Sequence, residues 1–123
     1  MTMSSQESEE KISHQVIGRR LSGVSFVLDY IQLQFDPPPT INALTPVTVR
    51  SGDRQSVQGE EPFRNLLCNQ ILKTVASVRL QQEEALTFEF ADGSEISLSL
   101  RPSDYVCPEA VNVYGKDHFC LVI

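Results

Sequence analysis

The side chains with the clearest capacity for chemistry lie near the end of the chain. Asp117, His118 and Cys120 are close in sequence, and on a strand His118 and Cys120 would share one face. A metal site needs three or four converging ligands, and this group offers at most two on that face. The sequence therefore predicts no metal site, and we expect no bound cofactor.

A cysteine–histidine nucleophile could be built from His118 with either Cys107 or Cys120. Cys120 lies in the apolar run of residues 119–123, where a thiol usually packs rather than reacts. Cys107 has no base beside it in the sequence. Neither pairing is favoured over a structural role for the thiols.

Paired carboxylates are the remaining source of acid–base chemistry. Glu60–Glu61 and Glu83–Glu84 flank predicted loops or turns, where solvated charge is the simplest interpretation. The motifs of phosphate-binding loops, dinucleotide-binding folds, serine hydrolases and zinc proteases are absent from the sequence. We expect a protein that is not an enzyme.

A surface for binding is the better candidate. Binding residues concentrate on irregular backbone, and the turn-rich connection after residue 100 carries an aromatic side chain among several charges. The alternative is that Tyr105 covers the edge of the core while Asp104 caps a turn. The candidate interaction surface consists of Arg101, Asp104, Tyr105, Glu109, Phe119, Leu121 and Ile123.

The composition indicates one acidic globular domain. The chain has 123 residues, 41% of them hydrophobic, and a net charge of −6, which is enough for a modest core. Nucleic acids and anionic membrane surfaces both require a basic face, which this sequence lacks. The longest apolar run is far too short to cross a bilayer. The sequence therefore predicts neither a nucleic-acid nor a membrane partner.

Three cysteines without close pairs argue against a disulfide framework or a zinc ribbon. The first ten residues have neither the basic start nor the apolar stretch of a secretory signal. We expect a cytoplasmic protein. Residues 1–11 would be a flexible acidic segment, and residues 12–123 a single β-rich domain.

The elements that would position the candidate residues are organised around residues 86–100. Apolar residues alternate in both arms of this stretch, which is typical of two half-buried strands. A two-residue turn at its Asp-Gly pair would set apolar positions of one strand against polar positions of the other. A loop of residues 91–93 instead pairs Phe88 with Ile96 and puts Gly93 at the left-handed position of a bulged turn. The sequence predicts this second register.

The same apolar pattern occurs twice. Residues 17–26 match residues 71–80, and residues 31–35 match residues 86–90 after one inserted residue. Each half would be strand, turn, strand, loop, strand. Alternating β sequences also align by chance, so duplication and coincidence are both open at this point.

Other segments complete the prediction. Residues 62–72 begin with proline and place apolar residues on one helical face, so they predict a helix. Residues 50–59 are polar and loop-like. The connection over residues 101–111 is turn-rich, with one helical turn expected after Pro108, and residues 118–123 would form a final strand.

Together these elements predict a mainly β fold, with α+β possible. The expected architecture is an antiparallel sandwich or a partly open barrel of two similar three-stranded halves, plus one short helix near residues 62–72. An apolar strand at the terminus should be covered by its own sheet or by another subunit. We therefore expect a protein partner, in the first place a second copy in a homodimer.

Three stretches also carry a resemblance: IGRRLSGV at residues 17–24, LTFEFADGS at residues 86–94, and RPSDY at residues 101–105, followed by PEA at residues 108–110. Over residues 16–111 the chain resembles a group of small bacterial proteins of unknown function, and some proteins of this appearance act as antitoxin-like immunity partners. The resemblance implies a non-enzymatic protein that acts through protein–protein contacts in an immunity-like or adaptor role. A small-ligand-binding β domain is the alternative.

Overall fold

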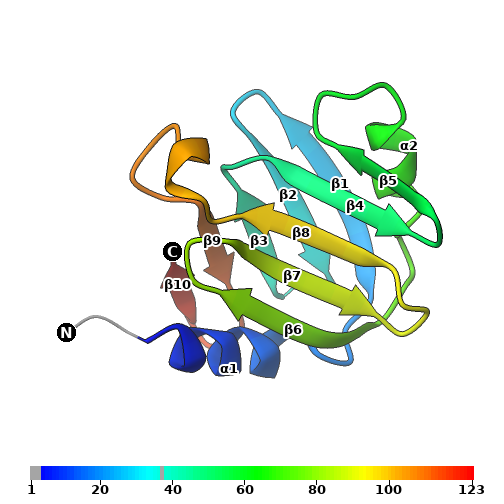
Figure 1. Ribbon diagram of the computed structural model, residues 1–123. Helices are drawn as coiled ribbons and strands as arrows, with labels where there is room; N and C mark the ends of the chain where they lie inside the picture. The colour runs from blue at the N-terminus through cyan, green and yellow to red at the C-terminus, as the bar shows by residue number, and fades with distance from the viewer. Residues whose placement is uncertain (1–3, 37) are drawn as a thin grey trace.

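The computed structural model describes residues 4–36 and 38–123. Two antiparallel five-stranded sheets face each other without closing into a barrel (Figure 1). The first sheet has the order β1-β2-β3-β9-β10, and the second sheet has the order β5-β4-β8-β7-β6. The predicted mainly β, antiparallel fold is confirmed. The elements are α1 (Ser5–Val16), β1 (Leu21–Val27), β2 (Tyr30–Phe35), β3 (Thr40–Ala43), β4 (Val47–Ser51), β5 (Arg54–Val57), α2 (Phe63–Cys68), β6 (Val75–Gln81), β7 (Ala85–Phe90), β8 (Glu95–Ser99), the 3-10 turn Pro102–Asp104, β9 (Val111–Tyr114) and β10 (Cys120–Val122).

The β7–β8 hairpin has the predicted three-residue loop. Phe88 pairs with Ile96, so the apolar positions of the two strands share one face. The N–H of Gly93 donates to the carbonyl of Phe90 at 2.9 Å, and Gly93 has a φ of +90°. A residue other than glycine is strained there, which explains why glycine follows Asp92 in this turn.

The two halves predicted from the repeat are both present. β1-β2-β3 and β6-β7-β8 are three-stranded meanders, and each has a bulge after the first residue of its first strand. Val24 pairs with Leu33 in one half, and Val78 pairs with Phe88 at the corresponding place in the other. The matching registers make coincidental alignment a poor explanation for the repeat.

The strands that follow each meander join the sheet of the other half. β4 and β5 follow β3 in the chain but extend the second sheet from β8, while β9 and β10 follow β8 but extend the first sheet from β3. Ile41 pairs with Val113 as Ile96 pairs with Val49. The halves therefore exchange their last two strands, and neither sheet is complete without both halves.

The core fills the space between the sheets. Its largest members include Phe35 and Phe88, whose ring centroids lie 5.5 Å apart. The side chains come from the inward-facing positions of both sheets and from both helices. Hydrophobic burial across this interface holds the sheets together, and the N–H of Val75 adds a hydrogen bond to the carbonyl of Arg19 at 2.9 Å where β1 and β6 begin.

A helix precedes each half, whereas the sequence predicts only one near residues 62–72. α2 occupies residues 63–68 of that stretch. Within the segment predicted to be flexible, residues 5–11 belong to α1, and residues 1–3 lie outside the described residues. Neither α1 nor α2 has the length and apolarity that a membrane-crossing helix needs.

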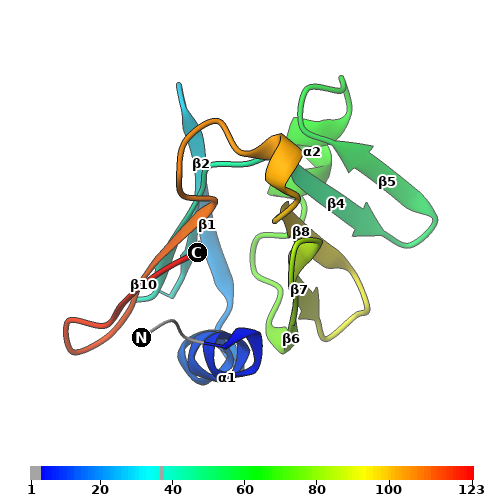
Figure 2. The same cartoon turned by 60° about the vertical axis from the view of Figure 1, so that its left-hand side comes forward.

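The sequence pattern indicates α1 only weakly, because Ser8, Ile12 and Val16 are the only buried residues of this helix. This stripe is too narrow to stand out among the charged residues around it. Tertiary contacts hold the helix: the Glu9 carboxylate accepts a hydrogen bond from the N–H of Leu80 at 2.8 Å. α1 thereby covers the free side of β6 (Figure 2).

Two further strands were not expected. β5 lies within residues 50–59, where only Ser56 is buried, so its alternation is nearly invisible in the sequence. β9 forms where a helical turn was predicted after Pro108, and the helical turn is instead the 3-10 turn that begins at Pro102. In both cases pairing with a neighbouring strand overrides weak local preference.

Candidate binding cleft

A cleft of about 620 Å³ opens between the sheets beside β10. Its walls are the connection over residues 101–109, the start of α1, the β6–β7 turn and the end of β10. Leu80, Leu100 and Ile123 contribute apolar surface to it. Clefts of about 300–1,000 Å³ with mostly apolar walls are typical of binding sites, and this one lies in that range.

Tyr105 provides the aromatic wall of the cleft. Its ring is half-buried, and this burial raises the pKa of the phenol above its ordinary value. The phenol therefore stays protonated at neutral pH. Its hydroxyl takes part in no hydrogen bond to another described residue, so it can donate to a bound group.

The structure places the apolar members of the predicted surface in different environments. Ile123 joins Tyr105 at the cleft. Leu121 is buried, and Phe119 packs half-buried against the core. The outward positions of β10 are occupied by Cys120 and Val122 instead, because successive strand residues point to opposite faces. The run of residues 119–123 has no polar alternation that could have revealed which face is outward.

The charged members of the predicted surface are engaged in local contacts. Arg101 pairs with Glu84 across 2.8 Å. Asp104 accepts a hydrogen bond from the hydroxyl of Ser99. Both belong to the rim between the cleft and the second sheet, and exposed pairs of this kind contribute little to stability.

Glu109 lies apart from this rim. Its carboxylate accepts a hydrogen bond from the side-chain amide of Asn112 at 2.9 Å, on the first sheet. Its backbone carbonyl accepts from the Cys107 thiol at 3.2 Å. Cys107 lines the cleft, so this weak bond connects Glu109 to the wall of the cleft.

The outer edge of β10 is unpaired beside the cleft. Ile123 and Val111 exchange two hydrogen bonds, with N···O distances of 2.9 and 3.1 Å. In an antiparallel ladder the next residue, Val122, then directs its N–H and C=O away from the neighbouring strand. The Val122 N–H has no hydrogen-bond acceptor within residues 4–36 and 38–123.

The corresponding edge of the second sheet is blocked. Val57 of β5 holds the position in the second sheet that Val122 of β10 holds in the first. Each lies opposite a residue of the neighbouring strand, β4 or β9, and that strand pairs with the other half. The N–H of Val57 donates to the Glu60 carboxylate at 2.7 Å. This bond, followed by one from the Ser56 hydroxyl, lowers the pKa of Glu60. Only β10 thus offers an open edge of the two.

Other proposed chemistry does not assemble. His118 has a φ of +63° and precedes β10, so the expectation that His118 and Cys120 share a strand face is wrong. Over the part of the chain that is described, no three His, Cys, Asp or Glu side chains gather closely enough to hold a metal ion. The three thiols are exposed and form no disulfide there.

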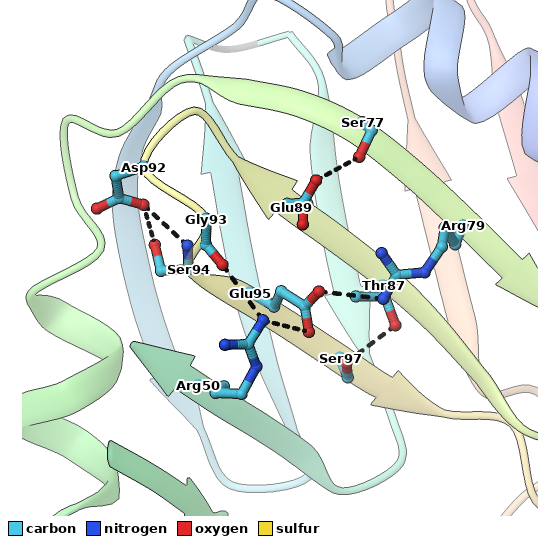
Figure 3. A network of polar contacts seen from close by, with 10 residues as sticks. All are labelled: Arg50, Ser77, Arg79, Thr87, Glu89, Asp92, Gly93, Ser94, Glu95 and Ser97. Atoms are coloured by element: carbon cyan, nitrogen blue, oxygen red, sulfur yellow. Dashed lines mark hydrogen bonds and ion pairs between the residues drawn. The ribbon is translucent and has the colours of Figure 1, made fainter. Parts of the chain in front are cut away.

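The outer face of the second sheet carries a polar network (Figure 3). Glu95 lies between Arg50 and Arg79, with N···O distances of 3.3 and 3.1 Å. The hydroxyls of Thr87 and Ser97 lie 2.9 Å apart. These groups satisfy one another, and they are best explained as the polar outward face of an antiparallel sheet on which Thr87 is buried by its neighbours.

Comparisons with protein-family models, with curated proteins and with solved structures find no match to this chain.

Proposed function

We propose that this protein is a non-enzymatic binding protein that captures an extended segment of a protein partner along β10. The open N–H and C=O of Val122 would pair with the backbone of that segment, and the neighbouring cleft would take one of its apolar side chains. Strand addition of this kind obtains affinity from the main chain and specificity from side-chain pockets. The free β10 edge beside an apolar cleft is the observation that carries the proposal.

The charge of the protein indicates the chemistry of the partner. Glu83 stands at the cleft, Glu109 lies on the connection that forms its wall, and the whole chain has a net charge of −6. A segment with apolar residues at alternate positions and basic residues beside them would match this surface. An immunity-like or adaptor role would be exercised through this contact. A cytoplasmic setting is supported by three free, exposed thiols.

Binding of a small apolar ligand is the second candidate. It is supported by the volume of the cleft, about 620 Å³, and by the unpartnered hydroxyl of Tyr105 in the described structure. A small ligand would use the cleft without the strand edge. The two candidates therefore differ in whether the backbone of Val122 takes part.

Substitution at Val122 tests the proposal. Val122→Pro removes the outward N–H but no hydrogen bond within the domain, and edge positions of this kind tolerate proline. Val122→Thr retains the N–H and is the matched control. We would select binders to the full chain from a displayed library of random decapeptides and map them by amide chemical shifts.

We expect selected peptides with alternating apolar residues and flanking lysine or arginine, and shifts at residues 120–123 and at Tyr105. Val122→Pro should weaken their binding at least tenfold, while Val122→Thr should change it less than threefold. Peptides that bind Val122→Pro as tightly as the unaltered chain would overturn strand addition. A small molecule that co-purifies with both variants in native mass spectrometry would favour the second candidate instead.

A further inference from the structure

The outer face of the first sheet carries no charged side chain on its described strands. Buried residues such as Leu33 and Ile41 point to the core, so their strand neighbours point outward. On the three central strands these outward residues are Tyr30, Gln32, Gln34, Thr40, Asn42, Asn112 and Tyr114. Figure 2 shows the first sheet nearly edge-on, with neither helix lying on its outer side.

The second sheet shows that the fold does not require this lack of charge. At the position corresponding to Thr40 it has Glu95, and at the position corresponding to Tyr114 it has Arg50. Each of these pairs lies directly opposite across two strands. The same backbone thus accommodates an ion pair on one face and a threonine–tyrosine pair on the other.

The uncharged side chains of this face also interact with one another. The amide of Gln32 donates to Asn42 at 3.1 Å, and Gln34 donates to Gln32 at 3.0 Å. Amides and hydroxyls both donate and accept hydrogen bonds, so such a face can be complementary to a copy of itself. Tyr114 is 45% exposed among them and supplies apolar area.

We infer that this face binds the same face of a second copy of the chain. A twofold interface brings one patch against itself, which amides and hydroxyls satisfy and like charges do not. Two copies with a net charge of −6 each repel over most of their surface, and the uncharged face lets them meet with the least repulsion. Charged groups such as Glu109, which bonds to Asn112, stand at its rim, as in protein interfaces generally.

The face is small for a protein interface. Five strands spaced about 4.8 Å apart, with about four residues rising 3.4 Å each, make a face of roughly 24 by 14 Å. A standard interface buries about 800 Å² on each partner, so this contact is small. We expect a reversible dimer with a Kd on the order of 100 µM.

The test transfers the ion pair of the second sheet to the first. The double variant Thr40→Glu with Tyr114→Arg keeps the net charge and reproduces a pair that this fold already holds. The double variant Arg50→Tyr with Glu95→Thr makes the reverse change on the second sheet and is the control. Sedimentation equilibrium of the full chain would cover concentrations on both sides of about 100 µM.

We expect the first double variant to weaken dimerisation at least tenfold and the control to change it less than threefold. Circular dichroism should show both variants folded. A chain that stays monomeric at about 1 mM overturns the inference, since a Kd near 100 µM would give mostly dimer there. It is also overturned if dimerisation survives the first double variant and is lost in Val122→Pro, because the copies then meet through the β10 edge.

Discussion

Asp92 shows how one side chain can organise a turn. One of its carboxylate oxygens lies 2.9 Å from the Lys73 ammonium, and the other accepts from the N–H of Ser94 at 2.9 Å. Together these contacts hold the pKa of Asp92 far below its ordinary value, and the hydrogen bond from Lys73 is the largest cause. The carboxylate joins the β7–β8 loop to the segment that enters β6.

The lowered pKa of Asp92 predicts a loss of stability in acid. The contribution is fully present above the unfolded-state pKa of about 3.9 and is lost as pH falls through the lower folded-state value. Asp92→Asn should lower the free energy of unfolding at pH 7 by about 0.5 kcal/mol, because half of the side chain is exposed. It should also lose less stability than the unaltered chain between about pH 4 and pH 2.

Urea unfolding at several pH values measures both effects. Asp53→Asn, in the exposed turn between β4 and β5, is the control and should follow the unaltered chain. Identical pH profiles for Asp92→Asn and the unaltered chain would contradict this role of the carboxylate.

The hairpin register was predictable from residues because its constraints are local. Phe88 and Ile96 must share the core face, and only a loop that ends on Gly93 allows this with a left-handed residue in place. The orientation of β10 was not predictable in this way. Leu121 and Val122 are both apolar, and only the core decides which is buried.

At the scale of elements, β5 and β10, which are corresponding edge strands of the two sheets, differ in one contact. The N–H of Val57 donates to the Glu60 carboxylate, while the corresponding N–H of Val122 has no acceptor in the described structure. Edge strands attract other strands unless they are covered, so this one side chain separates a protected edge from an available one. The difference is invisible in sequence because β5 itself was not predicted there.

Removing the carboxylate of Glu60 should open the β5 edge. In Glu60→Ala we expect amide hydrogen exchange at Val57 to accelerate at least fivefold, because the N–H loses its acceptor. Glu61→Ala, at the neighbouring exposed residue, is the control and should leave this rate unchanged. Exchange measured by NMR on the full chain gives the comparison, and an unchanged rate at Val57 in Glu60→Ala would show that the bond does not protect this edge.

At the scale of the whole molecule, the exchange of strands makes the two halves depend on each other. The β3–β9 and β4–β8 pairings both join residues of different halves. Separate fragments of residues 1–61 and 62–123 should each be largely unfolded, because each leaves apolar sheet faces uncovered. An equimolar mixture should regain the native sheet content.

Circular dichroism and NMR of the fragments, alone and mixed, measure this dependence. The fragment of residues 62–123 should fail to fold when it is mixed with a fragment of residues 1–61 that carries Ile41→Asp or Val49→Asp. Both residues are fully buried at the exchanged pairings. A single fragment that folds as a monomer would contradict the dependence of one half on the other.

The sequence by itself determined the class of the fold and the central hairpin, and it offered two similar halves as one of two explanations for its repeated pattern. Each of these follows from period-two alternation and from a glycine at a left-handed position, which act over a few residues. α1 and β5 escaped prediction because few of their residues are buried, so burial left little pattern to read.

Only the tertiary structure decided which strands meet. After β3 the chain could have turned back onto the same meander, but residues 44–46 instead carry it to the other sheet, where the Pro46 carbonyl accepts from the N–H of Ser99. Alternating strands offer similar apolar faces to many partners, so local pattern does not select among them. The choice depends on packing across the whole core, and it is this choice that leaves β10 at an open edge beside the cleft and one sheet face without charge.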